Sequence, residues 1–350
     1  MTFTTVKRSW DQGLTEEQRG RQRTYYETRV THRKLDDVIH AATPLLTPHN
    51  ESSILLIVGA TGVGKSTLVN VALRKLYNDR QAAMHADASI IPIVSVEAYH
   101  NGESRYSFAD IFQDLLTELS EPGLNKKRSI EIVDEKMEVR PGRKATIRAQ
   151  RRMVQSALRH RKTEVVVIDE AYHLLKLAKD TSVLDTLKSL ANKSSAKIVL
   201  VGSYDLFDLV ETHAQVARRA NIIHFDRYHH DVAEDRRTFK SIVGALTRKW
   251  PCKQIPNFPA ISDDLLEASL GLVGVLKAFL MDALAMQMRN GGKWDSRFLK
   301  QAAKSNKLRE AIRKEIEAGE GKVRDALYGQ SLWNDDAITR LTEKMGDADE

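Results

Sequence analysis

The feature that most constrains the fold is residues 54–70, which read ILLIVGATGVGKSTLVN. An apolar, β-branched run of strand length, Ile54–Val58, leads into a glycine-rich turn, and the residues after the turn have the spacing of a helix. The turn, residues 59–66, matches the phosphate-loop pattern G-x-x-x-x-G-K followed by Ser or Thr at every fixed position. This succession predicts an α/β protein in which the N-terminus of the helix faces a bound phosphate.

The residues of this turn predict a site for a nucleoside triphosphate. Its glycines allow positive φ, so that successive backbone N–H groups can point at phosphate oxygens. Lys65 would place a positive charge on the β- and γ-phosphates, and the Ser66 hydroxyl would help to hold Mg²⁺. ATP and Mg²⁺ are therefore the expected cofactors. The residues expected to contact the nucleotide are Gly59, Ala60, Thr61, Gly62, Val63, Gly64, Lys65, Ser66 and Thr67.

A second nucleotide signature is residues 164–170, EVVVIDE. Its four apolar residues, 165–168, predict a strand buried on both faces, with Asp169 and Glu170 at the carboxyl end, where ligands bind in an open α/β sheet. Asp169 is expected to hold Mg²⁺, directly or through water, and Glu170 to orient and deprotonate an attacking water. A hydrolase would use this second acid, whereas a nucleotide kinase has no obvious use for it. The pair therefore predicts ATP hydrolysis.

Two further polar positions are candidates for the same site. The expected strand 197–201 is followed by Ser203, which can either reach the γ-phosphate or cap the next helix, and the sequence favours neither. Arg218 and Arg219 stand just before an expected strand at 222–225. Either arginine could reach the phosphate of a neighbouring subunit, and the alternative is plain surface charge. We prefer the arginine finger, without separating the two residues.

A strongly basic stretch lies between the two nucleotide signatures. Residues 140–162 contain nine Lys or Arg and no carboxylate, whereas the whole chain has a net charge of only +7. From residue 145 on, the stretch has helical spacing. A solvated helix face usually mixes charges of both signs, so the missing acids favour contact with nucleic acid or another polyanion.

The pattern divides the chain into four parts: an N-terminal arm and helix at 1–50, a nucleotide-binding α/β domain at 51–230, a helical lid at 231–290, and a charged helical tail for partner contacts at 291–350. No apolar run approaches the roughly 20 residues of a membrane span. The N-terminus lacks an apolar signal core and Cys252 is the single cysteine, so a cytoplasmic protein is expected. The histidine-rich residues His224, Tyr228, His229 and His230 lack acidic or cysteine company at ligand spacing and are not expected to bind a metal.

Together these features resemble the AAA+ ATPases and, within them, the TnsC/TniB/MuB group of ATP-dependent regulators of DNA transposition. The resemblance covers about residues 31–288 and depends on GATGVGKST, VVVIDEAYHLL, VLVGSYDL, and the helix LGLVGVLKAFLMDALAMQM with its G-x-x-G. It implies a central parallel sheet flanked by helices, with a small C-terminal helical lid. Asp169 would hold the metal, Glu170 the water, Ser203 would be the first sensor, and Arg218 or Arg219 the finger supplied in trans.

The resemblance also implies partners. Proteins of this group assemble on duplex DNA as rings or helical filaments in the bacterial cytoplasm. They link a target-selector protein of the TniQ or TnsD type to transposase subunits, and hydrolysis promotes disassembly. Loops of the ATPase domain follow the DNA backbone, which makes Arg105, Arg143, Lys144 and Arg148 the candidate DNA contacts, without sequence preference.

One departure from the AAA+ sequence pattern affects the expected rate of ATP hydrolysis. Many AAA+ proteins carry a lid arginine in a G-x-x-R second sensor, whereas here Gly271 is followed three residues later by Gly274, with Lys277 one turn further on as a weak substitute. We therefore expect slow, DNA-stimulated hydrolysis. Two alternatives stay open: a replication-initiator or helicase-loader ATPase, and a nucleotide-gated adaptor that barely hydrolyses ATP. The acid pair argues against the adaptor and the missing arginine argues for it.

Overall fold

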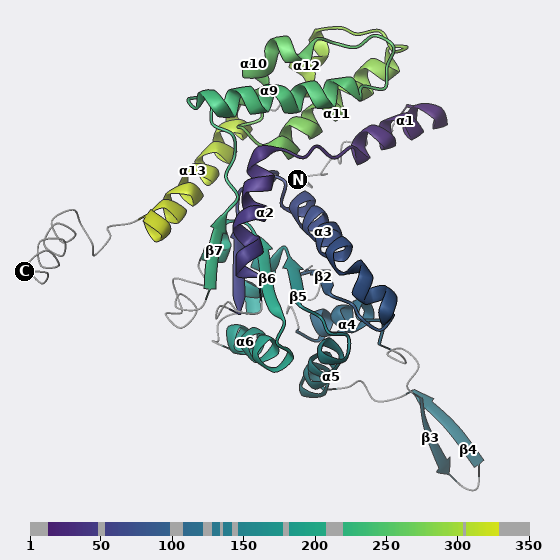
Figure 1. Ribbon diagram of the computed structural model, residues 1–350. Coiled ribbons are helices and arrows are strands. Elements are labelled where there is room, and N and C mark those ends of the chain that lie inside the picture. Colours follow the sequence, from purple (N-terminus) through teal and green to yellow (C-terminus); the bar gives the residue numbers. More distant parts are fainter. Residues whose placement is uncertain are drawn as a thin grey trace, which may run out of the picture.

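The computed structural model describes residues 13–47, 53–98, 108–121, 128–133, 136–141, 146–177, 182–207, 220–303 and 306–328. They form a sheet domain in which both nucleotide signatures lie, a helical lid above it, and a long C-terminal helix that runs between the two (Figure 1). The expected α/β class, with a central parallel sheet, flanking helices and a helical C-terminal part, is confirmed.

The sheet has five parallel strands in the order β2-β5-β6-β1-β7. β1 is buried at every residue because it lies between two neighbours and between two layers of helices, which explains its continuous apolar run. The strands are β1 (Ile54–Val58), β2 (Ile93–Glu97), β5 (Val165–Asp169), β6 (Lys197–Gly202) and β7 (Ala220–His224). The carboxyl ends of β1, β5 and β6 therefore meet at one edge, where the two signatures stand.

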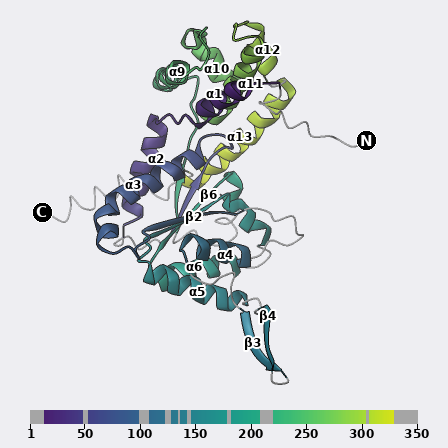
Figure 2. The ribbon, with the colours of Figure 1, turned by 90° about the vertical axis from the view of Figure 1, so that its right-hand side faces the viewer.

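Helices cover both faces of the sheet. α2 (Arg33–Leu45) and α3 (Lys65–Ala86) lie on one face, where they line a cavity together with Val165, Val167 and Val199. α4 (Phe108–Glu118), α5 (Ile147–His160) and α6 (Ser182–Ser194) contact one another in sequence and pack on β2 and β6. The chain moves in opposite directions along the sheet in the two groups of crossovers, so right-handed connections place α4–α6 on the opposite face (Figure 2).

The lid has its own hydrophobic core, which includes Trp250, Phe258 and Leu284. It consists of α9 (Ala233–Arg248), the short 3₁₀ helix η3 (Phe258–Ile261), α10 (Ser262–Ala268), α11 (Val273–Arg289) and α12 (Arg297–Ala302). The lid thus continues past residue 290, because Trp294 and Leu299 pack against its core.

The N-terminal segment is a correction to the expectation of an arm. Residues 16–27 form helix α1 (Glu16–Glu27), which packs on α11. Leu14 and Tyr25 are buried in the lid core, and Gln18 Nε2 donates to the carbonyl of Met288 at 3.1 Å. α1 is polar on most of its surface, so its few apolar residues look isolated in the sequence although they fill a defined position in the lid.

The sequence did not predict a hairpin in the charged stretch before α5, and it predicted a helical tail without its return to the sheet domain. β3 (Arg128–Val133) and β4 (Lys136–Pro141) pair as an antiparallel hairpin that projects from the sheet domain beyond α5 (Figures 1 and 2). α13 (Asn306–Tyr328) leaves the lid and returns to the sheet domain, whose core includes its Ile316 and Val323.

Within the described residues, no helix combines the length and the apolar character that a membrane span requires.

Candidate nucleotide site

The phosphate loop joins β1 to α3 with the backbone geometry that its glycines predict. Gly62 and Gly64 have φ of 87° and 122°, which side chains rarely allow. Gly59 is required for space, because a Cβ there would lie 2.5 Å from the carbonyl oxygen of Phe225. Among the described residues no side chain caps the first turn of α3, so its N–H groups and the helix dipole face the loop. These donors suit a phosphate.

Lys65 is held at this loop. Its side chain is buried, and its ammonium donates to the carbonyls of Gly59 at 2.9 Å and Ala60 at 3.1 Å. Burial lowers the pKa of Lys65, while the negative charges of Glu170 and Asp169 raise it. The cation therefore stands between the loop and the two acids, where a triphosphate would meet it.

Asp169 and Glu170 end β5 on the same edge of the sheet. The Asp169 carboxylate accepts the backbone N–H of Glu170 at 2.8 Å, and Glu170 has a φ of 49°, an uncommon value for a residue with a side chain. Both residues line a cavity of about 510 Å³ that also contains Ser66. The structure thus brings together the two acids and the hydroxyl that were predicted from separate motifs. A carboxylate and a hydroxyl oxygen are donors that suit Mg²⁺.

A third carboxylate on this cavity was missed by sequence reasoning. Glu97 ends β2, is paired in register with Asp169, and lines the same cavity. Burial raises the pKa of Glu170, and the neighbouring charges of Asp169 and Glu97 raise it further, against the opposing effect of Lys65. Glu97 could have been found only from the strand order, because the sequence does not show that β2 lies beside β5.

Ser203 follows β6, whose neighbours in the sheet are β5 and β1. Its hydroxyl donates to Asp205 at 3.2 Å, and within the described residues it makes no capping hydrogen bond to the 3₁₀ helix η2 (Tyr204–Leu206). Ser203 therefore stands between the strand of the acids and the strand of the phosphate loop.

The other predicted site residues are five arginines and one lysine. Arg148 is exposed in the first turn of α5, which Thr146 caps. Arg105, Arg143, Lys144, Arg218 and Arg219 lie outside the described residues.

The lid touches the phosphate loop directly. The backbone N–H of Gly274 donates to the carbonyl of Gly62 at 2.7 Å, and a Cβ at 274 would lie 2.6 Å from that oxygen. The departure from G-x-x-R thus has a structural reason, since the second glycine packs on the loop itself. Lys277 does not face the loop; its ammonium binds the carbonyls of Tyr26 and Thr28 at the end of α1.

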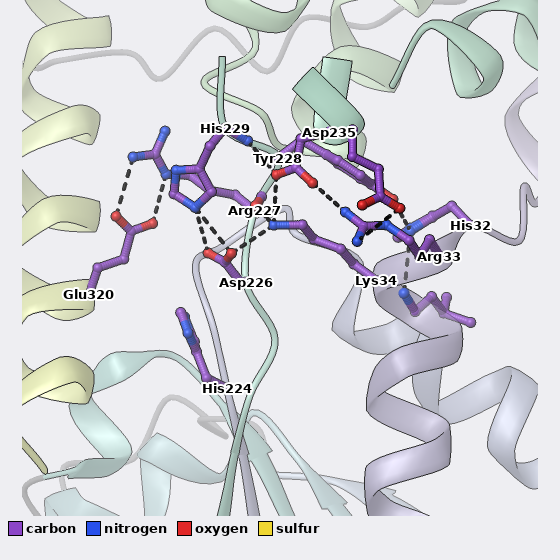
Figure 3. A network of polar contacts seen from close by, with 12 residues as sticks. His32, Arg33, Lys34, His224, Asp226, Arg227, Tyr228, His229, Asp235 and Glu320 are labelled. Atoms are coloured by element: carbon purple, nitrogen blue, oxygen red, sulfur yellow. Dashed lines mark hydrogen bonds and ion pairs between the residues drawn. The ribbon is translucent and has the colours of Figure 1, made fainter. Parts of the chain in front are cut away.

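Between the sheet and the lid lies a network of ion pairs (Figure 3). The ammonium of Lys34, in α2, contacts Asp226 at 2.7 Å and the buried Asp235, in α9, at 3.0 Å. Arg33 also contacts Asp235. Arg227 pairs with Glu320 of α13 at 2.7 Å. The network therefore ties α2, the segment after β7, the lid and α13 together.

This network corrects one premise about the histidine-rich residues. His229 does have acidic company, because its ligand atoms and those of Asp226 and Glu320 lie within 4.8 Å of one another. Asp226 lies 2.9 Å from Nε2 of His229 and also contacts the ammonium of Lys34. Glu320 contacts Arg227. Each carboxylate thus already has a cationic partner, so the geometry is that of an ion-pair network.

Comparisons with known proteins agree with this geometry. Residues 49–210 match the model of a family described as an AAA domain. Among the solved structures with this fold is the ORC1 protein of Aeropyrum pernix in complex with DNA, with 15% sequence identity, a TM-score of 0.54, and coverage of 81% of this chain and 68% of that chain. The ORC2 protein of the same organism, in ADPNP–ADP complexes, has 13% identity, a TM-score of 0.55, and coverage of 92% of this chain and 88% of that chain. A Walker-type ATPase of Pyrococcus abyssi has 16% identity, a TM-score of 0.50, and coverage of 92% of this chain and 93% of that chain. No curated protein matches the sequence.

These findings define the fold. Residues 49–210 match the AAA-domain model, and the described residues have the fold of AAA+ P-loop ATPases, with a helical C-terminal part. The narrower resemblance to the TnsC/TniB/MuB group stays a prediction.

Proposed function

We propose that the protein is an ATPase that binds Mg²⁺·ATP at the phosphate loop and hydrolyses it. The observation that carries this proposal is the single cavity that joins Ser66, Asp169 and Glu170 beside the buried ammonium of Lys65. Bound Mg²⁺ would neutralise charge on the phosphates and orient them for in-line attack. Ser66 and Asp169 would hold it, while Lys65 and the N–H groups of α3 bind phosphate oxygens.

Glu170 is the base in this mechanism. It would accept a proton from the attacking water as the new bond to the γ-phosphorus forms and the bond from that phosphorus to the bridging oxygen breaks, so that ADP leaves. The raised pKa of Glu170 makes it a stronger base than an ordinary glutamate. Ser203, at the end of β6, would contact the γ-phosphate. Arg218 or Arg219 of a second copy would neutralise charge in the transition state.

We further propose that the protein oligomerises on duplex DNA, as a ring or a helical filament. Support comes from the exposed arginines of α5, Arg148, Arg152 and Arg159, which continue the basic stretch that includes Arg143 and Lys144. One of the proteins that share the fold was solved in complex with DNA. Contacts to phosphates alone would bind DNA without sequence choice and weaken steeply with salt.

In this function the protein selects target sites for transposition by linking a target-selector protein to the transposase, with hydrolysis driving disassembly. The motifs quoted for the TnsC/TniB/MuB group support this role. The alternative, a replication-initiator or helicase-loader ATPase, gains support from the shared fold of the two ORC proteins. A transposase gene beside this gene would favour the first role, and a replicative helicase gene the second.

ATP turnover with and without duplex DNA tests the core of the proposal. We expect slow hydrolysis that DNA stimulates, and a fall of about 10²-fold or more in Glu170→Gln with ATP affinity retained, because the variant loses only the base. Lys65→Ala should lose ATP affinity instead. A wild-type protein that binds ATP without hydrolysing it, with or without DNA, would show a nucleotide-gated adaptor.

A further inference from the structure

The C-terminal helix α13 lies directly on the strand end that carries Ser203. A Cβ built at Gly319 of α13 would lie 2.1 Å from the ring of Tyr204, the residue after Ser203. A real Cβ does not come this close to another heavy atom, so only glycine allows the contact. Glycine destabilises the interior of a helix, and this close approach explains why α13 carries one at position 319.

An apolar stripe holds α13 in this place. Ile316 and Val323 are buried in the core of the sheet domain, and Ile312 packs against the same core. With Gly319 they follow the spacing of one helix face. α13 is therefore docked on the sheet domain through residues 312–323. Figures 1 and 2 show the helix running from the lid to the sheet domain.

The next residue fixes the register of this docking. Glu320 forms a two-pronged ion pair with Arg227, with Oε1 2.7 Å from Nε and Oε2 3.2 Å from Nη2 (Figure 3). The two side chains are only 11% and 18% exposed, so solvent screens the pair weakly. Arg227 also donates to the carbonyl of Leu270, before the lid helix α11, at 3.4 Å. α13 is thereby joined to the hinge between sheet and lid.

Tyr204 is held from a second side. Its hydroxyl lies 3.1 Å from Nε2 of His224, at the end of β7. The ring is therefore fixed between α13 and β7, and the backbone of the Ser203–Tyr204 turn is fixed with it.

We infer that α13 positions Ser203 for the γ-phosphate, so that docking of α13 controls the rate of hydrolysis. Gly319, Glu320 and Tyr204 are positioning residues in this scheme, since none of them contacts the nucleotide. The inference depends on the proposed function, because Ser203 matters only if ATP is hydrolysed here. A partner that moves α13 off the sheet would slow hydrolysis without releasing the nucleotide.

Two glycines of α13 provide a matched test. Gly319→Ala and Gly321→Ala change helix propensity alike, but among the described residues a Cβ at 321 would meet nothing within 4 Å beyond its chain neighbours and the backbone of its own helix. Gly319→Ala forces α13 and the Ser203–Tyr204 turn apart by about an ångström, and displacements of that size cost one to two orders of magnitude in rate. We expect kcat to fall about tenfold or more while KM for ATP and nucleotide affinity change less than about twofold. Gly321→Ala should match the wild type.

Glu320→Gln gives an independent variant that keeps the size of the side chain and loses its charge. It should lower kcat without changing nucleotide affinity, and the double variant with Gly319→Ala should lose little more than Gly319→Ala alone, since both undo one docking. An active wild type with equally active Gly319→Ala and Glu320→Gln variants would overturn the inference, as would equal losses in Gly319→Ala and Gly321→Ala. A wild type that binds but does not hydrolyse ATP would contradict the proposed function itself, before any variant is compared.

Discussion

Glu170 is half-buried beside the phosphate loop, and its surroundings set the pH range in which it can accept a proton. Burial, then Asp169 and Glu97, raise its pKa. Because a base acts only when deprotonated, kcat should fall as the pH drops through this raised pKa. Glu97→Gln removes one negative neighbour and lowers the pKa of Glu170, so the acid limb of the pH–rate profile should move to lower pH. A limb that stays in place or moves to higher pH would contradict this electrostatic role of Glu97.

Gly274 is the residue at which the lid meets the phosphate loop. Gly274→Ala places a methyl group 2.6 Å from the Gly62 carbonyl oxygen and must push the two apart. Overpacking of this kind costs about 1–3 kcal/mol, so ATP affinity should weaken about tenfold if the bound state needs this contact. Gly244→Ala is the control, because its new methyl would meet only the end of the Arg248 side chain at 3.6 Å. Equal affinities of the two variants, by calorimetry, would show that this contact does not support nucleotide binding.

Residues of the site differ in how far the sequence predicts them. Lys65, Ser66 and the acid pair at 169–170 belong to motifs whose spacing is imposed by the phosphate, so their positions could be stated in advance. Glu97 belongs to no motif, and it joins the site only because β2 pairs with β5. Gly274 could be noted as a departure, but its contact with Gly62 depends on how the lid docks.

Among the elements, the start of α2 combines a cap with a titratable group. His32 Nδ1 accepts the backbone N–H of Leu35 at 3.4 Å and lies 2.9 Å from the Tyr228 hydroxyl (Figure 3). Burial, with a smaller effect from Lys34, lowers the pKa of His32 to about 4. In the unfolded chain His32 has a pKa of about 6.5, so as the pH falls the unfolded state binds this proton before the folded state does. The free energy of unfolding should therefore decrease between about pH 6.5 and pH 4, by up to about 3 kcal/mol.

His32→Asn keeps a capping side chain that does not titrate. Its urea midpoint should therefore fall less between pH 7.5 and 5 than that of the wild type. His160→Asn, at an exposed histidine, is the control. A pH dependence that His32→Asn leaves unchanged would contradict the assignment.

Elements with continuous apolar runs or complete motifs, such as β1, β5 and α3, could be predicted. α1 was not predicted, and α13 was predicted only as part of a charged helical tail, without its docking on the sheet domain. Each of these helices buries a few widely spaced apolar residues on a mostly polar surface. Tyr25 and Ile316 reveal their partners only when the lid and the sheet core are assembled. The β3–β4 hairpin was missed for a different reason, since its strands mix charged and apolar residues within a polar stretch.

On the scale of the whole molecule, the basic stretch before the second signature predicts where DNA binds. Changing Arg143, Lys144 and Arg148 together to alanine should weaken binding to duplex DNA and reduce the slope of log affinity against log salt by about two to three, because that many phosphate contacts are lost. Nucleotide affinity should survive, since Arg148 lies on α5, outside the residues that line the nucleotide cavity. Unchanged DNA affinity at physiological salt would remove these residues from the interface.

The proposal that one copy builds the ATP site and the next copy completes it is tested most directly by the mass of the assembly in solution. Without ligands we expect the mass of a monomer or a small oligomer. With a non-hydrolysable ATP analogue, Mg²⁺ and duplex DNA we expect the mass of a large oligomer. A variant with both Arg218 and Arg219 changed to alanine should bind the analogue but assemble poorly or hydrolyse ATP slowly. A wild-type protein that stays monomeric with all three ligands present would contradict the shared site and leave a solitary nucleotide-binding switch.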